Sequence, residues 1–191
     1  MKTPHSIAAL FLLTLFAWAC KDDGTNNPNP EPEPEVPNIY KACCGAQAVE
    51  EAIGQGHVYI PNIFTPNSDG INDILLINAD DKIAEIEEWV VKDTAGNTVF
   101  EYYSFFPNRF EYGWLPDESE APGGLYTYEA RIKDTAGLLK TVSGSVCVYR
   151  CKTATDSILM ENIARCQFGV QHDGAGGYDP NSALLEPDSC F

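Results

Sequence analysis

Positively charged side chains are scarce in this chain. Its 191 residues include 12 Lys and Arg against 28 Asp and Glu, so the formal net charge at pH 7 is −16. A protein this acidic is repelled by nucleic acid and by anionic lipid surfaces, which excludes nucleic acid as a partner. We expect the carboxylates to form a solvated anionic surface outside the cell; contacts with divalent cations are the alternative.

The amino-terminal apolar run is too short for a membrane span. Ile7–Trp18 has twelve residues, whereas a spanning helix needs about twenty. With Lys2 before it, the run is typical of the core of a signal peptide. It ends in Ala17-Trp18-Ala19-Cys20, which resembles a bacterial lipobox whose Cys20 thiol receives a diacylglycerol. An ordinary secretory signal followed by a Cys is the alternative.

Residues 20–38 have the composition of a lipid-anchored spacer. Lys21-Asp22-Asp23 resembles the short acidic export signal of outer-face surface lipoproteins; a solvated linker is the alternative. Gly24–Asn38 alternates Pro with Asn and Glu, which favours an extended polyproline II conformation that cannot bury a core. Cleavage before Cys20 removes Lys2 and leaves 172 residues with a net charge of −17, enough for one sizeable domain.

The remaining cysteines predict disulfides. An even number of Cys in an exported chain is typical of a disulfide framework. We expect the Cys43/Cys44 segment to be joined to Cys147 and Cys151, or to the tail, and Cys166 to pair with Cys190. Adjacent Cys rarely bridge each other, so Cys43 and Cys44 are expected to have different partners. Zinc is the weaker alternative, because the chain has no C-x-x-C and few His.

The central part of the chain reads as short strands separated by turns. Leu125–Lys133 alternates apolar and polar side chains, which indicates an antiparallel strand with one wet face. Two Lys-Asp-Thr-Ala-Gly segments, Lys92–Gly96 and Lys133–Gly137, predict hairpin loops. We therefore predict an all-β, immunoglobulin-like antiparallel β-sandwich with a disulfide-stapled C-terminal extension. The other expected strands and buried runs are His57–Ile60, Ile74–Ile77, Glu85–Lys92, Thr98–Tyr103 and Leu138–Tyr149.

Five landmarks between Val58 and Arg150 resemble a known family, the gliding motility-associated or type B sorting domain of the type IX secretion system. They are Ile60–Asp73 (IPNIFTPNSDGIND), Gly96–Glu101, Gly113-Trp114, the P-x-G-x-Y-x-Y strand at Pro122–Tyr128, and Gly144–Arg150. The resemblance implies a β-domain on the bacterial cell surface, without naming a reaction. In one departure, Thr94-Ala95-Gly96 replaces the family's usual Arg-Trp-Gly.

A larger departure concerns the end of the chain. In secreted cargo of this family the domain comes last, whereas 41 residues follow Arg150 here. They include a possible short helix over Asp156–Arg165 and a Gly-rich loop. The predicted organisation is thus a signal peptide (1–19), an anchored linker (20–38), a β-sandwich (39–150) and a Cys-containing extension (151–191).

The entry motif offers the densest set of oxygen ligands. Asn67, Asp69, Asn72 and Asp73 supply side-chain oxygens within seven residues, and oxygens on a turn can hold calcium. The spacing is not that of an EF-hand. The alternative is a structural Asx turn around Asp69-Gly70.

Other candidate sites are weaker. Trp89, Trp114 and Tyr102–Phe106 are expected to lie mostly in the core, with sugar stacking as the alternative. His172-Asp173 can be read as an acid–base pair or as a surface loop. We find no Ser, Cys or His arrangement for nucleophilic catalysis, and therefore predict no enzymatic activity.

These observations predict a non-catalytic surface lipoprotein. It would be anchored in the outer membrane through Cys20, face the medium, and bind a protein or glycan partner within a gliding, adhesion or secretion assembly. The alternative is a type IX secretion substrate whose β-domain serves mainly as a sorting signal. No cofactor is predicted apart from possible calcium.

Overall fold

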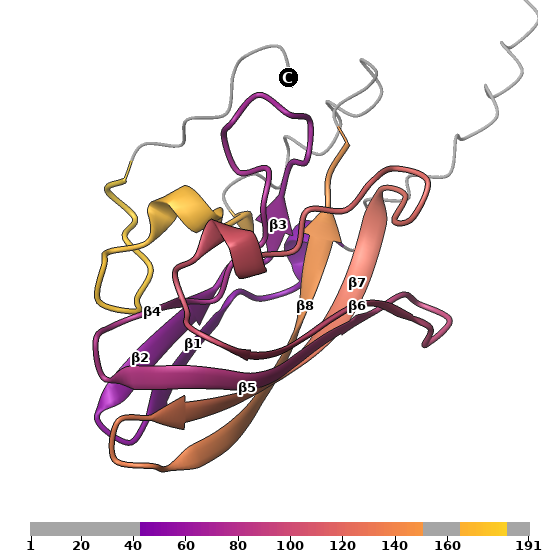
Figure 1. Ribbon diagram of the computed structural model, residues 1–191. Coiled ribbons are helices and arrows are strands. Elements are labelled where there is room, and N and C mark those ends of the chain that lie inside the picture. The colour runs from indigo at the N-terminus through magenta and orange to yellow at the C-terminus, as the bar shows by residue number, and fades with distance from the viewer. Residues whose placement is uncertain (1–42, 151–164, 183–191) are drawn as a thin grey trace, which may run out of the picture. The chain divides into compact units, whose positions relative to one another are not determined.

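The structure, a computed structural model, describes residues 43–150 and 165–182 (Figure 1). Cys20, Cys151, Cys190 and the expected helix over 156–164 lie outside the described residues, as does the Cys44 side chain. Within these two ranges, no helix has the length and apolar character needed to cross a membrane. The described helices are three short 3-10 turns: η1 (Cys43–Gly45), η2 (Phe110–Tyr112) and η4 (Gly169–Gln171).

The strands form two sheets that pack as a sandwich. A three-stranded sheet has the order β1-β2-β4, and a five-stranded sheet has the order β3-β8-β7-β5-β6. All neighbours are antiparallel except β3 and β8, which are parallel. The all-β sandwich prediction is confirmed, with this one parallel pair as an addition. The strands are β1 (Val49–Ile53), β2 (Gly56–Ile60), β3 (Ile63–Phe64), β4 (Asn78–Ala79), β5 (Ile83–Lys92), β6 (Thr98–Phe105), β7 (Gly124–Asp134) and β8 (Leu139–Val148).

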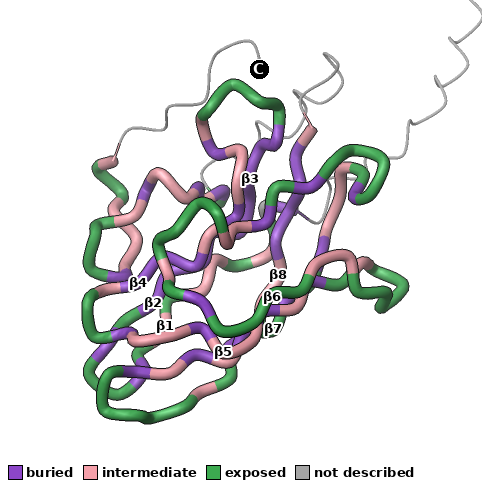
Figure 2. The backbone as a smooth tube through the Cα atoms, viewed as in Figure 1, coloured by how far each residue is buried: buried purple, intermediate pink, exposed green. Residues whose placement is uncertain are grey.

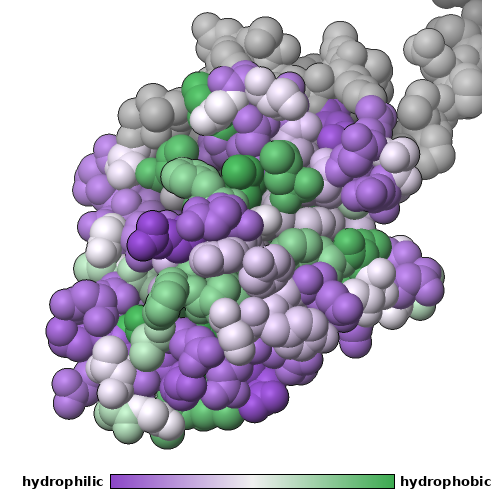
Figure 3. All heavy atoms as spheres, viewed as in Figure 1, coloured by the Kyte–Doolittle hydropathy of each residue, from purple (hydrophilic) through white to green (hydrophobic). Residues whose placement is uncertain are grey.

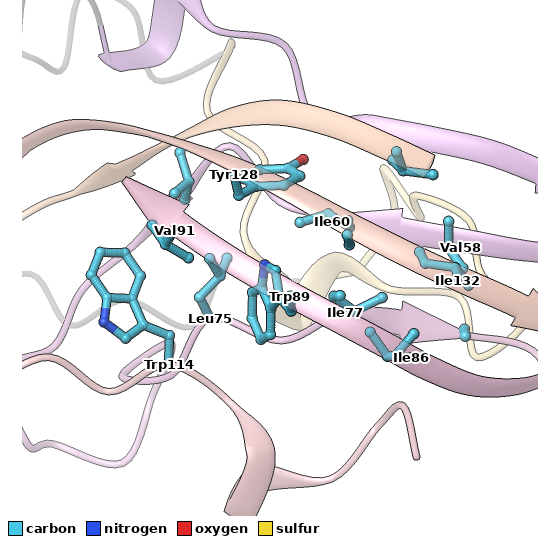
Figure 4. Close-up of a cluster of buried hydrophobic side chains, with 14 of the residues drawn as sticks. Val58, Ile60, Leu75, Ile77, Ile86, Trp89, Val91, Trp114, Tyr128 and Ile132 are labelled. Atoms are coloured by element: carbon cyan, nitrogen blue, oxygen red, sulfur yellow. The ribbon is translucent and has the colours of Figure 1, made fainter. Parts of the chain in front are cut away.

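The core lies between the inner faces of the two sheets (Figure 4). Val58 and Ile60 from β2 face Ile86 and Trp89 from β5, and all four are fully buried. Along β7 every second residue is buried, as Figure 2 shows by the change of colour along the tube. This period-two burial is what the alternating sequence of Leu125–Lys133 predicts.

The segment Ile74–Ile77 is a buried run as expected at Leu75 and Ile77, and it forms one isolated bridge, between Leu75 and Trp114. One further strand is an addition to the prediction. Strand β1 is absent from the prediction, because its sequence, VEEAI, lacks clean alternation. β1 pairs with β2 through a tight turn in which Gly54 has a φ of +62°.

Both predicted hairpin loops are confirmed. Asp93 Oδ1 accepts the backbone N–H groups of Ala95 and Asn97, at 2.9 and 2.8 Å. Asp134 Oδ1 does the same for Ala136 and Leu138, at 2.9 and 2.7 Å. These Asx turns connect β5 with β6 and β7 with β8, so each Asp satisfies amides that the sheet ladder leaves unpaired.

A disulfide joins the start of the described chain to the end of β8. Cys43 and Cys147 are bonded, with Cα atoms 4.9 Å apart and a sequence separation of 104. This confirms the predicted disulfide between the Cys43/Cys44 segment and Cys147. Closing a loop of this length stabilises the fold by about 4–5 kcal/mol in the chain-entropy account. Cys166 is also disulfide-bonded, but its predicted pairing with Cys190 falls outside the described residues.

The expectation that Tyr102–Phe106 is core is wrong for most of that run. Phe105 is buried at 5% exposure, whereas Tyr103 and Phe106 are 53% and 64% exposed. β6 is the outer strand of its sheet, and Ser104 has a φ of +52°. The side-chain alternation shifts at Ser104, which turns Phe105 rather than its neighbours toward Trp89. Trp89 and Trp114 are buried as expected.

Phe105 and Phe106 provide a matched pair for testing this register. We expect Phe105→Ala to lower the free energy of unfolding by about 3–5 kcal/mol, because it leaves a cavity beside Trp89. Phe106→Ala should change it by less than about 0.5 kcal/mol, since this ring is exposed. Urea titration followed by tryptophan fluorescence measures both. Equal losses in the two variants would contradict the register.

Candidate functional site

Three of the sequence landmarks converge at one end of the sandwich. The ring of Trp114 lies 5.4 Å from that of Phe64 and 5.2 Å from that of Tyr126. Gly113 lets the chain before Trp114 lie close against residues 74 and 75. A Cβ at this position would lie 2.3 Å from an Ile74 methyl group and 2.9 Å from the Leu75 carbonyl oxygen. The entry motif, the Gly-Trp pair and the P-x-G-x-Y strand therefore form one packed unit.

Arg150 fastens the loops above this aromatic cluster. Its Nη1 donates to the carbonyl oxygen of Pro66 at 3.1 Å, and its Nη2 donates to those of Pro116 and Ala121 at 2.9 and 3.0 Å. A guanidinium presents several donors in a fixed plane, which suits it to joining separate carbonyls. The last landmark residue thus holds the entry loop against the 116–121 loop.

The entry loop is organised by its own carboxylates. Asp73 Oδ1 accepts the backbone N–H groups of Asn67 and Ser68 at 2.9 and 2.6 Å, and its Oδ2 accepts that of Gly70 at 2.7 Å. Asp69 Oδ1 accepts the N–H of Ile71 at 2.8 Å, which is an Asx turn. The loop projects beyond β3 and is exposed at its tip (Figure 2).

These contacts bear on the calcium hypothesis. Asn67 bonds Asp69 through both of its amide atoms, and Asn72 turns its Oδ1 away toward the N–H of Val170, at 3.4 Å. Three of the four candidate ligands are brought together, but their oxygens already accept amide protons. Across residues 43–150 and 165–182, no group of three His, Cys, Asp or Glu side chains is placed to hold a metal ion. The geometry is that of the structural turn, and calcium stays a prediction.

The segment 165–182 packs onto the sandwich as a further layer. Asn62, 1% exposed, provides the central contact. Its backbone N–H donates to the Gln167 carbonyl at 3.2 Å, its Oδ1 accepts the Gln167 N–H at 2.7 Å, and its Nδ2 donates to the Arg165 carbonyl at 2.8 Å. The same Nδ2 donates to the Ala46 carbonyl at 2.7 Å, and the Asn62 carbonyl accepts the Cys147 N–H at 2.8 Å.

A small second core lies beneath this segment. Phe168 is 2% exposed and packs with Ile63, Tyr149 and the Cys43–Cys147 disulfide. The Tyr59 hydroxyl donates to the Phe168 carbonyl at 3.0 Å. Burial raises the pKa of Tyr59 far above its ordinary value. Tyr59 therefore acts as a buried hydrogen-bond donor, because ionisation would cost too much in this environment.

His172 and Asp173 do not form an acid–base pair. His172 stacks on Tyr59 with ring centres 6.2 Å apart, and its Nε2 accepts the Gly176 N–H at 3.1 Å. Asp173 Oδ1 accepts the N–H groups of Ala175 and Gly177, and lies 4.0 Å from Nε2. Burial lowers the pKa of His172, against the opposing charge of Asp173. Both side chains therefore close the 172–178 loop.

A surface cavity of about 390 Å³ lies between this loop and β1 and β2. It is lined by Glu50, Glu51, His57 and Asp173 among others, and none of its lining side chains is a Ser, Thr or Cys nucleophile. Glu50 accepts the Tyr178 N–H and Glu51 is paired with Lys140. Glu50 thus joins the segment to β1, whereas Glu51 joins β1 to β8.

An exposed aromatic face lies along β6 and η2, which we call the β6 aromatic face. Tyr102 contacts the rings of Phe105 and Tyr112 at 5.4 and 5.3 Å, so its exposed edge rests on a rigid base. The Tyr103 hydroxyl donates to Glu101 at 3.2 Å. Hydrophobic side chains reach the surface on the side that carries η2 (Figure 3). The exposed members of the face are Tyr102, Phe106 and Phe110, whereas Tyr103 points to the opposite side of β6, beside Glu101.

Sequence reasoning missed the parts played by Tyr59 and Asn62. Asn62 stands between Pro61 and Ile63 in an apolar run, IPNIF, and this isolated polar residue was the available signal. A polar side chain buried in such a run must find partners. Two of its partners, Arg165 and Gln167, lie more than one hundred residues away, so the sequence alone does not reveal them.

Residues 58–148 match the family model described as CHU_C Type IX secretion signal domain. The match covers all of the landmarks up to Val148 and leaves the segment 165–182 outside. No curated protein matches the chain.

Asp73 offers a test of how the entry loop is held. Asp73→Asn removes one of two acceptor oxygens that serve three backbone N–H groups. We expect the free energy of unfolding to fall by about 1–3 kcal/mol. Asp81→Asn is the control, because that carboxylate is exposed and pairs only with Lys82. Chemical denaturation with and without calcium chloride gives both values; a calcium-dependent gain lost in Asp73→Asn would instead support a cation site.

His172 predicts a loss of stability below neutral pH. Its folded pKa is lowered, so as pH falls the unfolded chain takes up the proton first, from about pH 6.5. The free energy of unfolding should thus have its full value above this pH. Below it, the free energy should decline by at most about 1.4 kcal/mol per pH unit for one proton. We expect a shallower decline in His172→Asn. Denaturation curves between pH 7.5 and 5.5 test this, and equal slopes would contradict it.

Proposed function

Residues 58–148 form a type IX secretion signal domain, and on that premise we propose that the chain is a non-catalytic lipoprotein displayed on the bacterial outer surface. The family places the protein in type IX secretion and at the cell surface or beyond it. Our proposal adds that the domain is the retained working body of the protein, held to the outer membrane through Cys20. In this reading it serves as a binding or structural module of a gliding, adhesion or secretion assembly.

The contact between the domain and segment 165–182 carries this proposal. Asn62 and Tyr59 belong to the matched domain, and they bond Arg165, Gln167 and Phe168, which lie beyond it. An address that is read and removed needs to be separable from the rest of its protein. Here the domain shares a buried core with the segment that follows it, which supports retention.

Anchoring by lipid rests on the leader and the linker. The apolar run before Ala17-Trp18-Ala19-Cys20 suits a lipoprotein signal, and several acyl chains on Cys20 would hold a protein firmly at about 0.8 kcal/mol per buried methylene. The Pro- and Glu-rich linker to Asn38 would then extend the head from the membrane.

The β6 aromatic face is where we propose that a partner binds. Exposed Tyr and Phe rings supply large contact area at low entropic cost. The chain is strongly acidic, which disfavours nucleic acid and leaves a protein or glycan as the partner. A catalytic role has no support from His172, since its Nε2 accepts a backbone N–H in the 172–178 loop.

Mass spectrometry of the protein from its native membrane tests anchoring and retention together. We expect Cys20 to carry acyl chains and the same molecule to retain residues 58–182, because the anchor and the domain both belong to the mature protein. Cys20→Ala should release an otherwise intact protein from the membrane. An unmodified Cys20 would reject the anchor, whereas an acylated product lacking residues 58–148 would favour a removable sorting signal.

A further inference from the structure

The surface of the domain under segment 165–182 has the properties of a peptide-binding groove. Its walls are Tyr59, Asn62, Ile63 and Asn72, all within residues 58–148, together with Tyr149. The occupant comes from outside the domain. We propose that this groove recognises the 165–182 segment as a ligand, so that it binds the same segment from a second copy of the chain as well as its own.

Recognition begins with the backbone of the occupant. Asn62 makes three hydrogen bonds to the main chain of two residues: it donates to the carbonyls of Arg165 and Gln167 and accepts the Gln167 N–H, at distances of 2.7 to 3.2 Å. Together, the Asn62 side-chain amide and backbone N–H offer the occupant's main chain both donors and an acceptor, as the edge of a β-sheet does. Peptides that add to a sheet edge gain their affinity in this way, through main-chain hydrogen bonds.

Specificity comes from one aromatic anchor. Phe168 fills the pocket formed by Ile63 and Tyr149 and is almost fully buried, while its carbonyl accepts the Tyr59 hydroxyl at 3.0 Å. Beyond the anchor, the Tyr59 ring packs between those of His172 and Tyr178, at 6.2 and 6.1 Å. Buried aromatic anchors in desolvated pockets typically dominate the energy of peptide interfaces.

The occupant is also organised by its own hydrogen bonds. Gln171 Oε1 accepts the Phe168 N–H at 3.0 Å, and the Gln171 carbonyl accepts the Asp179 N–H at 2.7 Å. Its Nε2 donates to the Tyr178 hydroxyl at 3.4 Å. A segment whose turn is set by internal contacts loses less entropy when it docks. This is expected of a ligand that binds as a unit.

The experiment uses the full mature chain with its own occupant weakened. Cys166→Ser removes the disulfide of Cys166, the thiol of its former partner is alkylated, and Phe168→Ala removes the anchor. The probe is a fluorescent synthetic peptide of residues 165–182 carrying Cys166→Ser, and fluorescence anisotropy measures its binding. We expect saturable binding to the double variant, and at least tenfold weaker binding to Cys166→Ser alone, whose own Phe168 still fills the pocket.

Two further variants separate recognition from folding. In the double variant, adding Tyr59→Phe should weaken binding several-fold, since it removes only the hydroxyl that reaches the Phe168 carbonyl, and Asn62→Ala should weaken it at least tenfold. A control peptide with Phe168→Ala should not bind. Absence of saturable binding, or equal binding of the two peptides, would overturn the proposal. Failure of the double variant to unfold cooperatively would also overturn it, because the domain would then not fold unless its own segment were docked.

Discussion

The buried amide of Asn62 joins parts of the chain that lie far apart in sequence. It bonds Ala46, Arg165 and Gln167, while its own carbonyl accepts the N–H of Cys147. A buried polar side chain left without partners costs about 1–3 kcal/mol, so each of these segments adds to the stability of the others. The Cys43–Cys147 disulfide closes the same region covalently. This constraint makes the segment beyond the domain part of the folded unit.

The matched domain has internal packing of its own, to which the following segment is added. Its landmark residues Phe64, Trp114 and Tyr126 pack together, and Arg150 holds the loops above them. Phe64, Trp114 and Tyr126 lie within the matched residues 58–148, and Arg150 follows that range by two residues. The layer formed by 165–182 is added to that unit, and it covers Tyr59 and Ile63, which would otherwise present apolar surface to water. Such a cover is favourable, since exposed apolar patches promote association.

The aromatic residues are divided between two roles by the position of β6 at the edge of its sheet. Trp89, Phe100 and Phe105 form the inner end of a continuous series of ring contacts, and Tyr102 forms its outer end. The inner rings make the outer ones rigid, which is favourable for recognition because little side-chain entropy remains to be lost. The partner surface that we propose there does not need a deep pocket.

Hydrophobic alternation and turn chemistry were sufficient to predict much of the fold. Leu125–Lys133 alternates because one face of β7 is buried, and the two Lys-Asp-Thr-Ala-Gly loops form local Asx turns that depend on neighbouring residues only. The resemblance of the landmarks likewise identified the family, since short motifs in fixed order are a property of the sequence itself. Leu75 and Ile77 were recognised as apolar but not as irregular chain, because an apolar run has the same composition in either conformation.

Tertiary structure decided what the sequence left open. Which of Tyr102–Phe106 face water depends on the edge position of β6 and on the shift at Ser104, and neither is encoded in a local pattern. The partners of Asn62, Tyr59 and His172 are set by how segment 165–182 lies on the sandwich. Sequence determines the local preferences of each segment, whereas contacts between distant segments arise only when buried polar groups and apolar faces are satisfied together in one folded chain.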